Sequence, residues 1–168
     1  MINKIKIFTL LILLGFSFSS VNAEESISSV RTYSHFDEQK AFNLVKKIFR
    51  THSSEKYIID TSWEELHITE RSASGYFNLT TTINHLVLKV EKTMDHNHSI
   101  MHLELYKTSD TDEIKHYIPA NEFSHELLWN RLEYGLGLNN EWINCFTLSE
   151  FLSFTYPLCA IDKESLQP

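Results

Sequence analysis

Histidines supply the cluster of side chains in this sequence whose types and spacing best suit metal chemistry. Asp95, His96, Asn97 and His98 are consecutive, and His102 follows four residues later. If a strand begins early, its alternation places His96, His98 and His102 on one face, where imidazoles could hold zinc or copper. Asp and Asn are also the residues that a hairpin turn favours. A metal site at the three histidines and an ordinary turn are both open interpretations.

Motifs of nucleophilic and nucleotide-dependent catalysis are absent from the sequence. There is no GxSxG elbow, and Gly75, Gly135 and Gly137 form no phosphate-binding or dinucleotide-binding fingerprint. Glu64 and Glu65 are adjacent, but neighbours on a strand point to opposite faces, which does not suit joint acid–base work. The sequence therefore identifies no particular catalytic residue, and it predicts no cofactor. An enzyme with a site built from scattered residues stays one of the alternatives.

Aromatic side chains are the remaining candidates for binding a ligand or partner. The three tryptophans, with Tyr134 and Phe146, could line a groove between the last helix and a sheet. Aromatic residues are also frequent in hydrophobic cores, and the sequence does not separate the two roles. We treat Trp129, Tyr134 and Trp142 as a candidate binding surface, with core packing as the alternative.

The N-terminus has the three-part organisation of a cleaved secretory signal. Two lysines precede an apolar run at 7–14, and small residues follow as far as Ala23. Val21 and Ala23 occupy the positions that a signal peptidase needs small, which predicts cleavage after Ala23. A membrane span takes about 20 apolar residues, more than this run provides, and an uncleaved anchor is the alternative. We therefore expect a periplasmic or secreted protein without stable membrane insertion.

The charge balance narrows the range of partners. The chain has 15 Lys and Arg against 22 Asp and Glu, a formal net charge of −7 at pH 7 that becomes −9 once two lysines leave with the signal. Such a surface repels nucleic-acid phosphates and anionic lipids, and it steers cationic proteins favourably. We expect another envelope or secreted protein as the partner, and no nucleic acid.

Cys145 and Cys159 are the two cysteines of the chain. In an exported protein an isolated pair predicts a disulfide, which here would add about 3 kcal/mol of stability by restricting the unfolded chain. A cysteine nucleophile and a two-cysteine metal site are the alternatives, but the pair lacks CxxC spacing.

Hydrophobic periodicity predicts helices on either side of a set of strands. The expected helices cover 37–51, 123–134 and, more briefly, 149–154, where Tyr156-Pro157 would end the last one. The expected strands cover 57–63, 66–71, 76–92, 100–107 and 114–118.

These elements predict a single α+β domain over residues 24–168, with a signal peptide over 1–23. We expect an antiparallel sheet of four to five strands, with an N-terminal and a C-terminal helix packed on one face. The combined observations favour a non-catalytic binding or accessory protein of the cell envelope, such as an inhibitor of a secreted partner. A histidine-based metal-binding protein and a small secreted enzyme are the alternatives.

Overall fold

A computed structural model describes residues 27–34, 36–53, 55–74, 80–93, 98–145 and 154–167. The predicted signal peptide, His96 and nearly all of the short helix expected at 149–154 lie outside these ranges. In the described ranges, no helix is long and apolar enough to cross a membrane.

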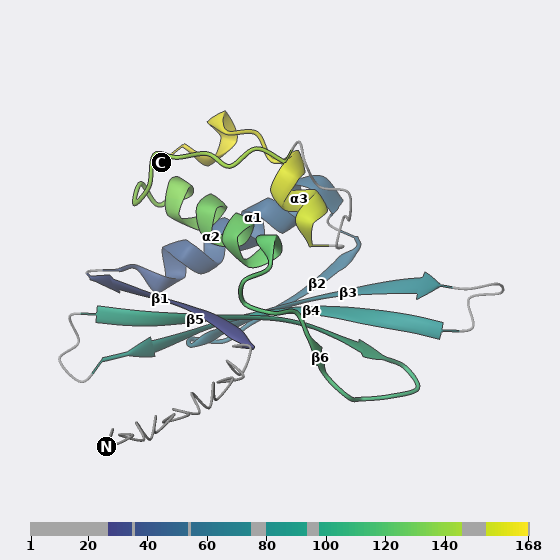
Figure 1. Ribbon diagram of the computed structural model, residues 1–168. Helices are drawn as coiled ribbons and strands as arrows, with labels where there is room; N and C mark the ends of the chain where they lie inside the picture. The colour runs from purple at the N-terminus through teal and green to yellow at the C-terminus, as the bar shows by residue number, and fades with distance from the viewer. Residues whose placement is uncertain are drawn as a thin grey trace, which may run out of the picture.

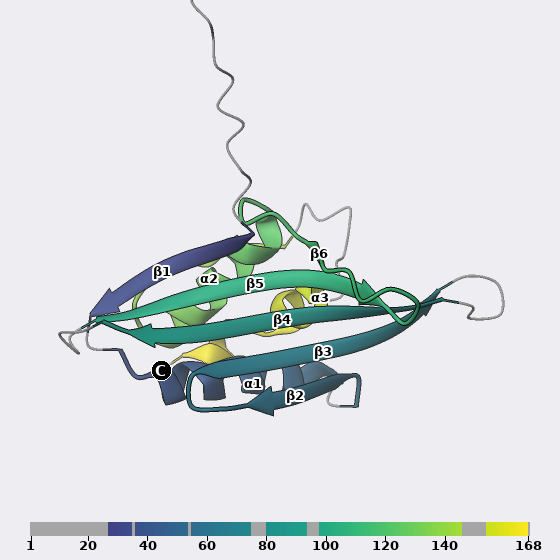
Figure 2. The same cartoon turned by 90° about the horizontal axis from the view of Figure 1, so that it is seen from below.

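An antiparallel sheet with the strand order β1-β5-β4-β3-β2 forms one layer of the fold (Figures 1 and 2). A sixth strand, β6, pairs with β5 beyond the end of β1. The strands are β1 (Ser28–Ser34), β2 (Tyr57–Thr61), β3 (Glu65–Ser74), β4 (Thr80–Lys92), β5 (His98–Ser109) and β6 (His116–Tyr117).

Alternating side chains divide the sheet into a buried face and an uncovered face. On the two central strands, Leu86 lies opposite Leu105 and Leu88 opposite Leu103, and all four are buried. Because side chains alternate along a strand, the residues between them point the other way. On β5, Met101, Leu103 and Leu105 all point to the buried face.

Three helices pack against the buried face: α1 (Glu38–Ser53), α2 (Phe123–Gly135) and α3 (Thr155–Ala160). Figure 1 shows them together on one side of the sheet, with a short 3₁₀ turn, η2 (Glu164–Leu166), near the C-terminus. The α+β class is confirmed, with a sheet of six strands where four to five were expected. After α2, Gly137 adopts a φ of 73°, a left-handed conformation that favours glycine.

The position of Tyr156-Pro157 corrects one sequence-based expectation. These residues lie within the first turn of α3, where the sequence predicted the end of a helix. The first turn has no intrahelical acceptor for its backbone N–H groups, so a proline there removes no hydrogen bond. The helix thus begins at Thr155, includes Tyr156 and Pro157 in its first turn, and continues to Ala160.

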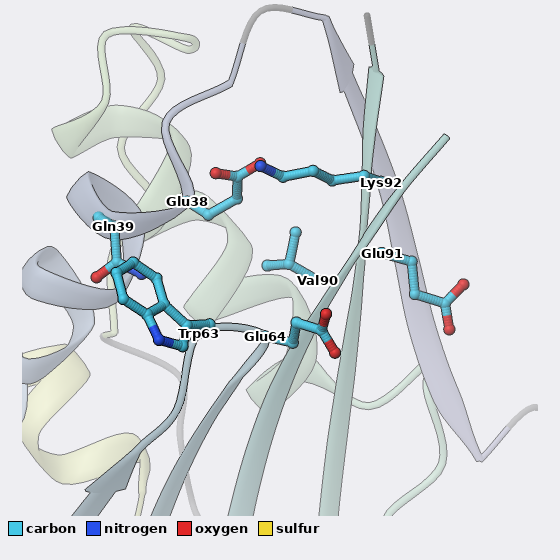
Figure 3. A pocket seen from close by; sticks show the side chains of 7 residues that line it. All are labelled: Glu38, Gln39, Trp63, Glu64, Val90, Glu91 and Lys92. Carbon is cyan, nitrogen blue, oxygen red and sulfur yellow. The ribbon is translucent and has the colours of Figure 1, made fainter. Parts of the chain in front are cut away.

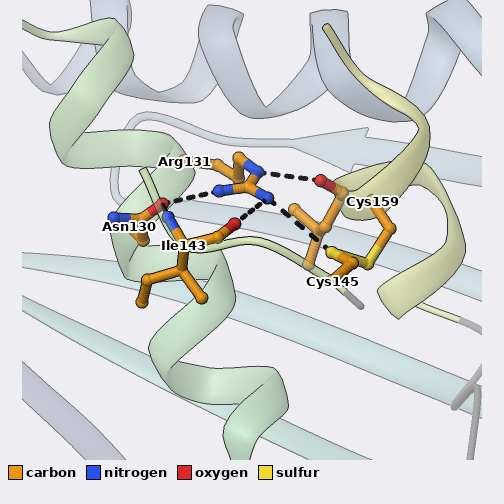
Figure 4. The surroundings of a disulfide bond; sticks show 6 residues. Asn130, Arg131, Ile143, Cys145 and Cys159 are labelled. Carbon is orange, nitrogen blue, oxygen red and sulfur yellow. Dashed lines mark hydrogen bonds between the residues drawn. A yellow bond between two sulfur atoms is a disulfide. The ribbon is translucent and has the colours of Figure 1, made fainter. Parts of the chain in front are cut away.

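The predicted disulfide between Cys145 and Cys159 is confirmed, with an S–S distance of 2.08 Å (Figure 4). It connects the segment after α2 to α3. A disulfide is typical of an oxidising compartment, which agrees with the predicted export.

Arg131 of α2 is the main polar group beneath this C-terminal segment. Its side chain is only 1% exposed, and it donates from Nε to the Leu158 carbonyl and from Nη2 to the Ile143 carbonyl, each at 2.8 Å (Figure 4). Nη1 donates to Asn130 Oδ1 at 2.6 Å, and the guanidinium lies 3.6 Å from the centre of the Trp142 ring. Burial lowers the pKa of Arg131 to about 10. One guanidinium thus bonds α2 to two later segments.

A second buried network attaches the edge strand β1 to α2. Trp129 Nε1 donates to Ser29 Oγ at 2.8 Å, and this hydroxyl lies 2.8 Å from His125 Nδ1. The other nitrogen of His125, Nε2, lies 3.2 Å from the Ile118 carbonyl. With the proton of His125 on Nε2, the serine hydroxyl donates to Nδ1 and each of these groups has a partner. Burial is the main reason that the pKa of His125 is lowered.

Candidate binding site

A cavity of about 490 Å³ opens where the N-terminus of α1, the β2–β3 connection and the end of β4 meet (Figure 3). These three segments are far apart in sequence and are brought together because α1 lies across the sheet. The lining residues are Glu38 and Gln39 of α1, Trp63 and Glu64 of the connection, and Val90, Glu91 and Lys92 of β4.

Trp63 is the most exposed large hydrophobic side chain in the described part of the structure, at 84%. It lies in the short connection between β2 and β3, where the backbone N–H of Ser62 donates to the Glu65 carbonyl at 2.8 Å. The backbone N–H of Val90 donates to the Glu64 carbonyl at 2.8 Å, which fixes the connection against β4. The local backbone is thus held by hydrogen bonds while the indole itself projects into solvent.

The acidic side chains of the cavity differ in whether they have a counter-ion. Glu38 Oε1 lies 3.6 Å from Lys92 Nζ. Glu91 lies 3.6 Å from His102 and, as Figure 3 shows, points away from the cavity towards the uncovered face of the sheet. No ion pair within the described ranges involves Glu64. Its carboxylate is therefore the negative charge of the cavity that is available to a ligand.

This combination of groups suits a cation carried on an apolar stem. An indole face attracts ammonium and guanidinium groups, and a nearby carboxylate adds a charged hydrogen-bond acceptor. Val90 contributes an apolar floor between Glu38 and Glu64 (Figure 3). Lysine and arginine side chains have this chemistry, because each joins a cationic head to a methylene chain. The described lining residues include no His, Ser or Cys.

The three aromatic residues of the expected binding surface are much less exposed than Trp63. Trp129 is 2% exposed and Tyr134 is 9% exposed, so both belong to the hydrophobic core. Trp142 is part-exposed and packs edge-on against Tyr134, with ring centres 5.1 Å apart. The inward face of α2 buries the first two residues, so these three side chains do not form an exposed aromatic surface.

The predicted histidine site is only partly covered by the described residues. His98 is the first residue of β5, and His102 lies four residues further on, about 13 Å away at 3.3 Å per residue. His96 lies outside the described residues. Within those residues, no group of three or more His, Cys, Asp or Glu side chains is arranged to hold a metal ion. The three-histidine site stays a prediction.

Sequence reasoning missed the cavity around Trp63 because its three segments meet only through the tertiary fold. The residue fell at the end of an expected strand and was grouped with the two other tryptophans. A signal was nevertheless present, since an aromatic residue between Ser62 and Glu64 interrupts an otherwise polar connection between two strands. A large apolar side chain in such a short connection lies away from the hydrophobic core and is therefore exposed.

Comparisons with known proteins give little further help. No family model and no curated protein matches the chain. Among solved structures, the chain is similar to a DUF4468 family protein from Bacteroides ovatus, with 10% sequence identity over 85% of this chain and 81% of that chain. The TM-score is 0.27. At that level the likeness carries no argument about fold or function.

Proposed function

We propose that the chain is a non-catalytic binding protein of the cell envelope that recognises a basic segment of another envelope or secreted protein. The observation that carries the proposal is the 84% exposed indole of Trp63 at the mouth of a cavity beside Glu64. The residue to be recognised is a lysine or arginine, seated between the indole face and the carboxylate.

The energetic contribution of Trp63 follows from its exposed area. An aromatic side chain of this size buries about 200 Å² in a contact, which at about 25 cal/mol per Å² amounts to about 5 kcal/mol before the costs of association. A cation over the ring adds about 0.5–2 kcal/mol. Part of this energy offsets the ordering of both partners. A net contribution of about 2–3 kcal/mol is typical of a tryptophan hot spot.

Charge supports the same class of partner. The net charge of −7 favours the approach of a basic protein, an effect that weakens as salt screens it. The disulfide and the predicted signal peptide both support a partner in an oxidising compartment outside the cytoplasm. An accessory or inhibitory role would follow if the captured segment were part of a functional site of the partner.

The test measures binding of defined peptides to the purified chain by fluorescence anisotropy. The probe is a labelled eight-residue peptide with two arginines, compared with the same peptide carrying two glutamines. We expect the arginine peptide to bind more tightly, and Trp63→Ala to weaken that binding about 30-fold or more, the equivalent of 2 kcal/mol. Glu64→Gln should weaken it to a smaller extent and reduce its dependence on salt.

A matched control is available in Tyr156, another exposed aromatic side chain, which lies on α3. Tyr156→Ala should leave peptide binding unchanged. Because Trp63 has little contact with the core, Trp63→Ala should change the free energy of unfolding by less than about 0.5 kcal/mol. Equal binding of the two peptides, or equal effects of the two alanine variants, would refute the proposal.

A further inference from the structure

Two histidines meet on the uncovered face of the sheet, away from the Trp63 cavity. His67 belongs to β3 and His85 to β4, and they are diagonal neighbours, because His67 lies opposite Val87 and His85 lies opposite Thr69. His67 Nε2 and His85 Nδ1 are 3.1 Å apart, and the ring centres are 5.3 Å apart. In the metal-free state the proton of one imidazole forms a hydrogen bond to the other.

The separation of the two nitrogens matches that of neighbouring ligands on one metal ion. With metal–nitrogen bonds of about 2.0–2.1 Å, two ligands at 90° lie about 2.9 Å apart and two ligands at a tetrahedral angle lie about 3.4 Å apart. The observed 3.1 Å lies between these limits. The distance between the two nitrogens therefore allows one divalent ion to contact both, once each ring turns its lone pair towards the ion.

The orientation of His85 is already fixed by contacts that a metal ligand needs. Its second nitrogen, Nε2, lies 2.9 Å from Thr108 Oγ1, so this nitrogen can donate while Nδ1 binds an ion. Its ring also stacks on Tyr106, with centres 4.4 Å apart and planes 11° apart. Metal-binding histidines commonly donate from their other nitrogen to such an outer partner, which fixes the tautomer.

Local electrostatics also favour the neutral, metal-binding form of both rings. Burial is the main cause that lowers the pKa of His67 and that of His85, the latter to about 4. His67 lines a second cavity, of about 300 Å³, together with Asp60 and Glu65. Two lysines lie near the pair: Lys89 is 3.9 Å from Glu65, which reduces its repulsion of an incoming ion, whereas Lys115 lies 4.6 Å from the centre of the Tyr106 ring and also lowers the pKa of both histidines.

We propose that His67 Nε2 and His85 Nδ1 form a two-imidazole site for a divalent copper or zinc ion, with water in the remaining positions. Binding moves the proton of His67 from Nε2 to Nδ1, so both rings stay neutral and no proton is lost. The carboxylates of Asp60 and Glu65 then favour the cation electrostatically. Nitrogen ligands suit both metals, and copper should bind more tightly than zinc.

The test is isothermal titration calorimetry of the metal-free chain with copper and zinc salts. We expect one ion per chain, and we expect His67→Gln and His85→Gln each to weaken binding at least tenfold. A matched control replaces His98 and His102 with glutamine, which removes two imidazoles of β5 and should leave binding unchanged. Copper bound at the proposed site should give an electron paramagnetic resonance spectrum with coupling to two imidazole nitrogens.

Thr108→Val provides a second test that leaves both ligands in place. Loss of the outer hydroxyl should weaken metal binding about tenfold and should leave the circular dichroism spectrum unchanged. Absence of binding would overturn the proposal. Binding that survives His67→Gln and His85→Gln but disappears in the His98/His102 variant would also overturn it, and would support the site predicted at His96, His98 and His102.

Discussion

Replacement of Arg131 by methionine tests the role of the buried guanidinium at the C-terminal end of the fold. Methionine has a similar length and fills much of the same space, but it donates no hydrogen bond. The carbonyl groups of Leu158 and Ile143 would each lose a donor now at 2.8 Å. The contact of the guanidinium with Trp142 would also be lost.

The expected loss of stability follows from these contacts. A buried acceptor left without a donor costs about 1–3 kcal/mol, and two are created. The cation–π contact adds about 1–2 kcal/mol. The variant no longer buries a charge, which offsets part of the loss, and burial already lowers the pKa of Arg131 to about 10. We expect Arg131→Met to lower the free energy of unfolding by about 3–5 kcal/mol.

Urea denaturation followed by circular dichroism measures this loss, and hydrogen exchange locates it. Exchange should accelerate first in α3 and in the segment around Ile143, because Arg131 connects these segments to α2. Arg131→Lys keeps the charge but not the planar fork, so it should lose about half as much. Arg31→Met is the control, since that side chain is 50% exposed and lies 3.9 Å from Glu133, a contact worth less than about 1 kcal/mol.

Two results would refute this reasoning. The first is an Arg131→Met variant whose stability lies within about 1 kcal/mol of the original chain. The second is a destabilised variant in which α3 exchanges no faster relative to the sheet than before. Either result would mean that the hydrogen bonds of the guanidinium do not hold the C-terminal segment in place.

Three further perturbations test other parts of the structure. Ser29→Ala leaves the buried indole N–H of Trp129 without an acceptor and should lower the free energy of unfolding by about 2–3 kcal/mol in urea denaturation, whereas a loss below 0.5 kcal/mol would contradict the network. The pKa of His85 is about 4 in the folded chain against 6.5 in the unfolded chain, so the unfolded chain takes up the proton first. Stability should therefore be full above pH 6.5 and fall as the pH drops towards 4, by at most about 3 kcal/mol before solvent screening, and His85→Gln should flatten this profile. Replacement of Cys145 and Cys159 by alanine should cost about 3 kcal/mol, and intact-mass analysis should find both thiols unreactive to alkylation until the chain is reduced.

The sheet and its helices were predictable because their patterns are local. Side chains on 100–107 alternate between apolar and polar, and those on 37–51 repeat at helical intervals, so each element follows from a short window. The edge strand β1 is not among the strands that the sequence predicts, because few of its residues are apolar. It pairs with β5 along its length and accepts a hydrogen bond from Trp129 of α2 at Ser29, and no local pattern indicates either contact.

The candidate sites were less predictable for the same reason. The Trp63 cavity needs three segments that meet only in the folded chain. His67 and His85 are 18 residues apart on two strands, and the register between these strands decides that they touch. The sequence instead drew attention to histidines that are close along the chain. Proximity in sequence indicates a shared site on a turn or helix, but along an extended strand it separates side chains by several ångströms per residue.

The pairing of β1 with β5 has a consequence for the order in which the chain can fold. During synthesis or translocation, which both begin at the N-terminus, β1 emerges first but has no neighbour until β5 has also emerged. Its hydrogen bond from Trp129 joins residues 100 positions apart. Contacts of such high sequence separation slow folding. The first strand therefore joins the sheet late. Until β5 has emerged, the part of the chain that follows the predicted export signal stays unpaired.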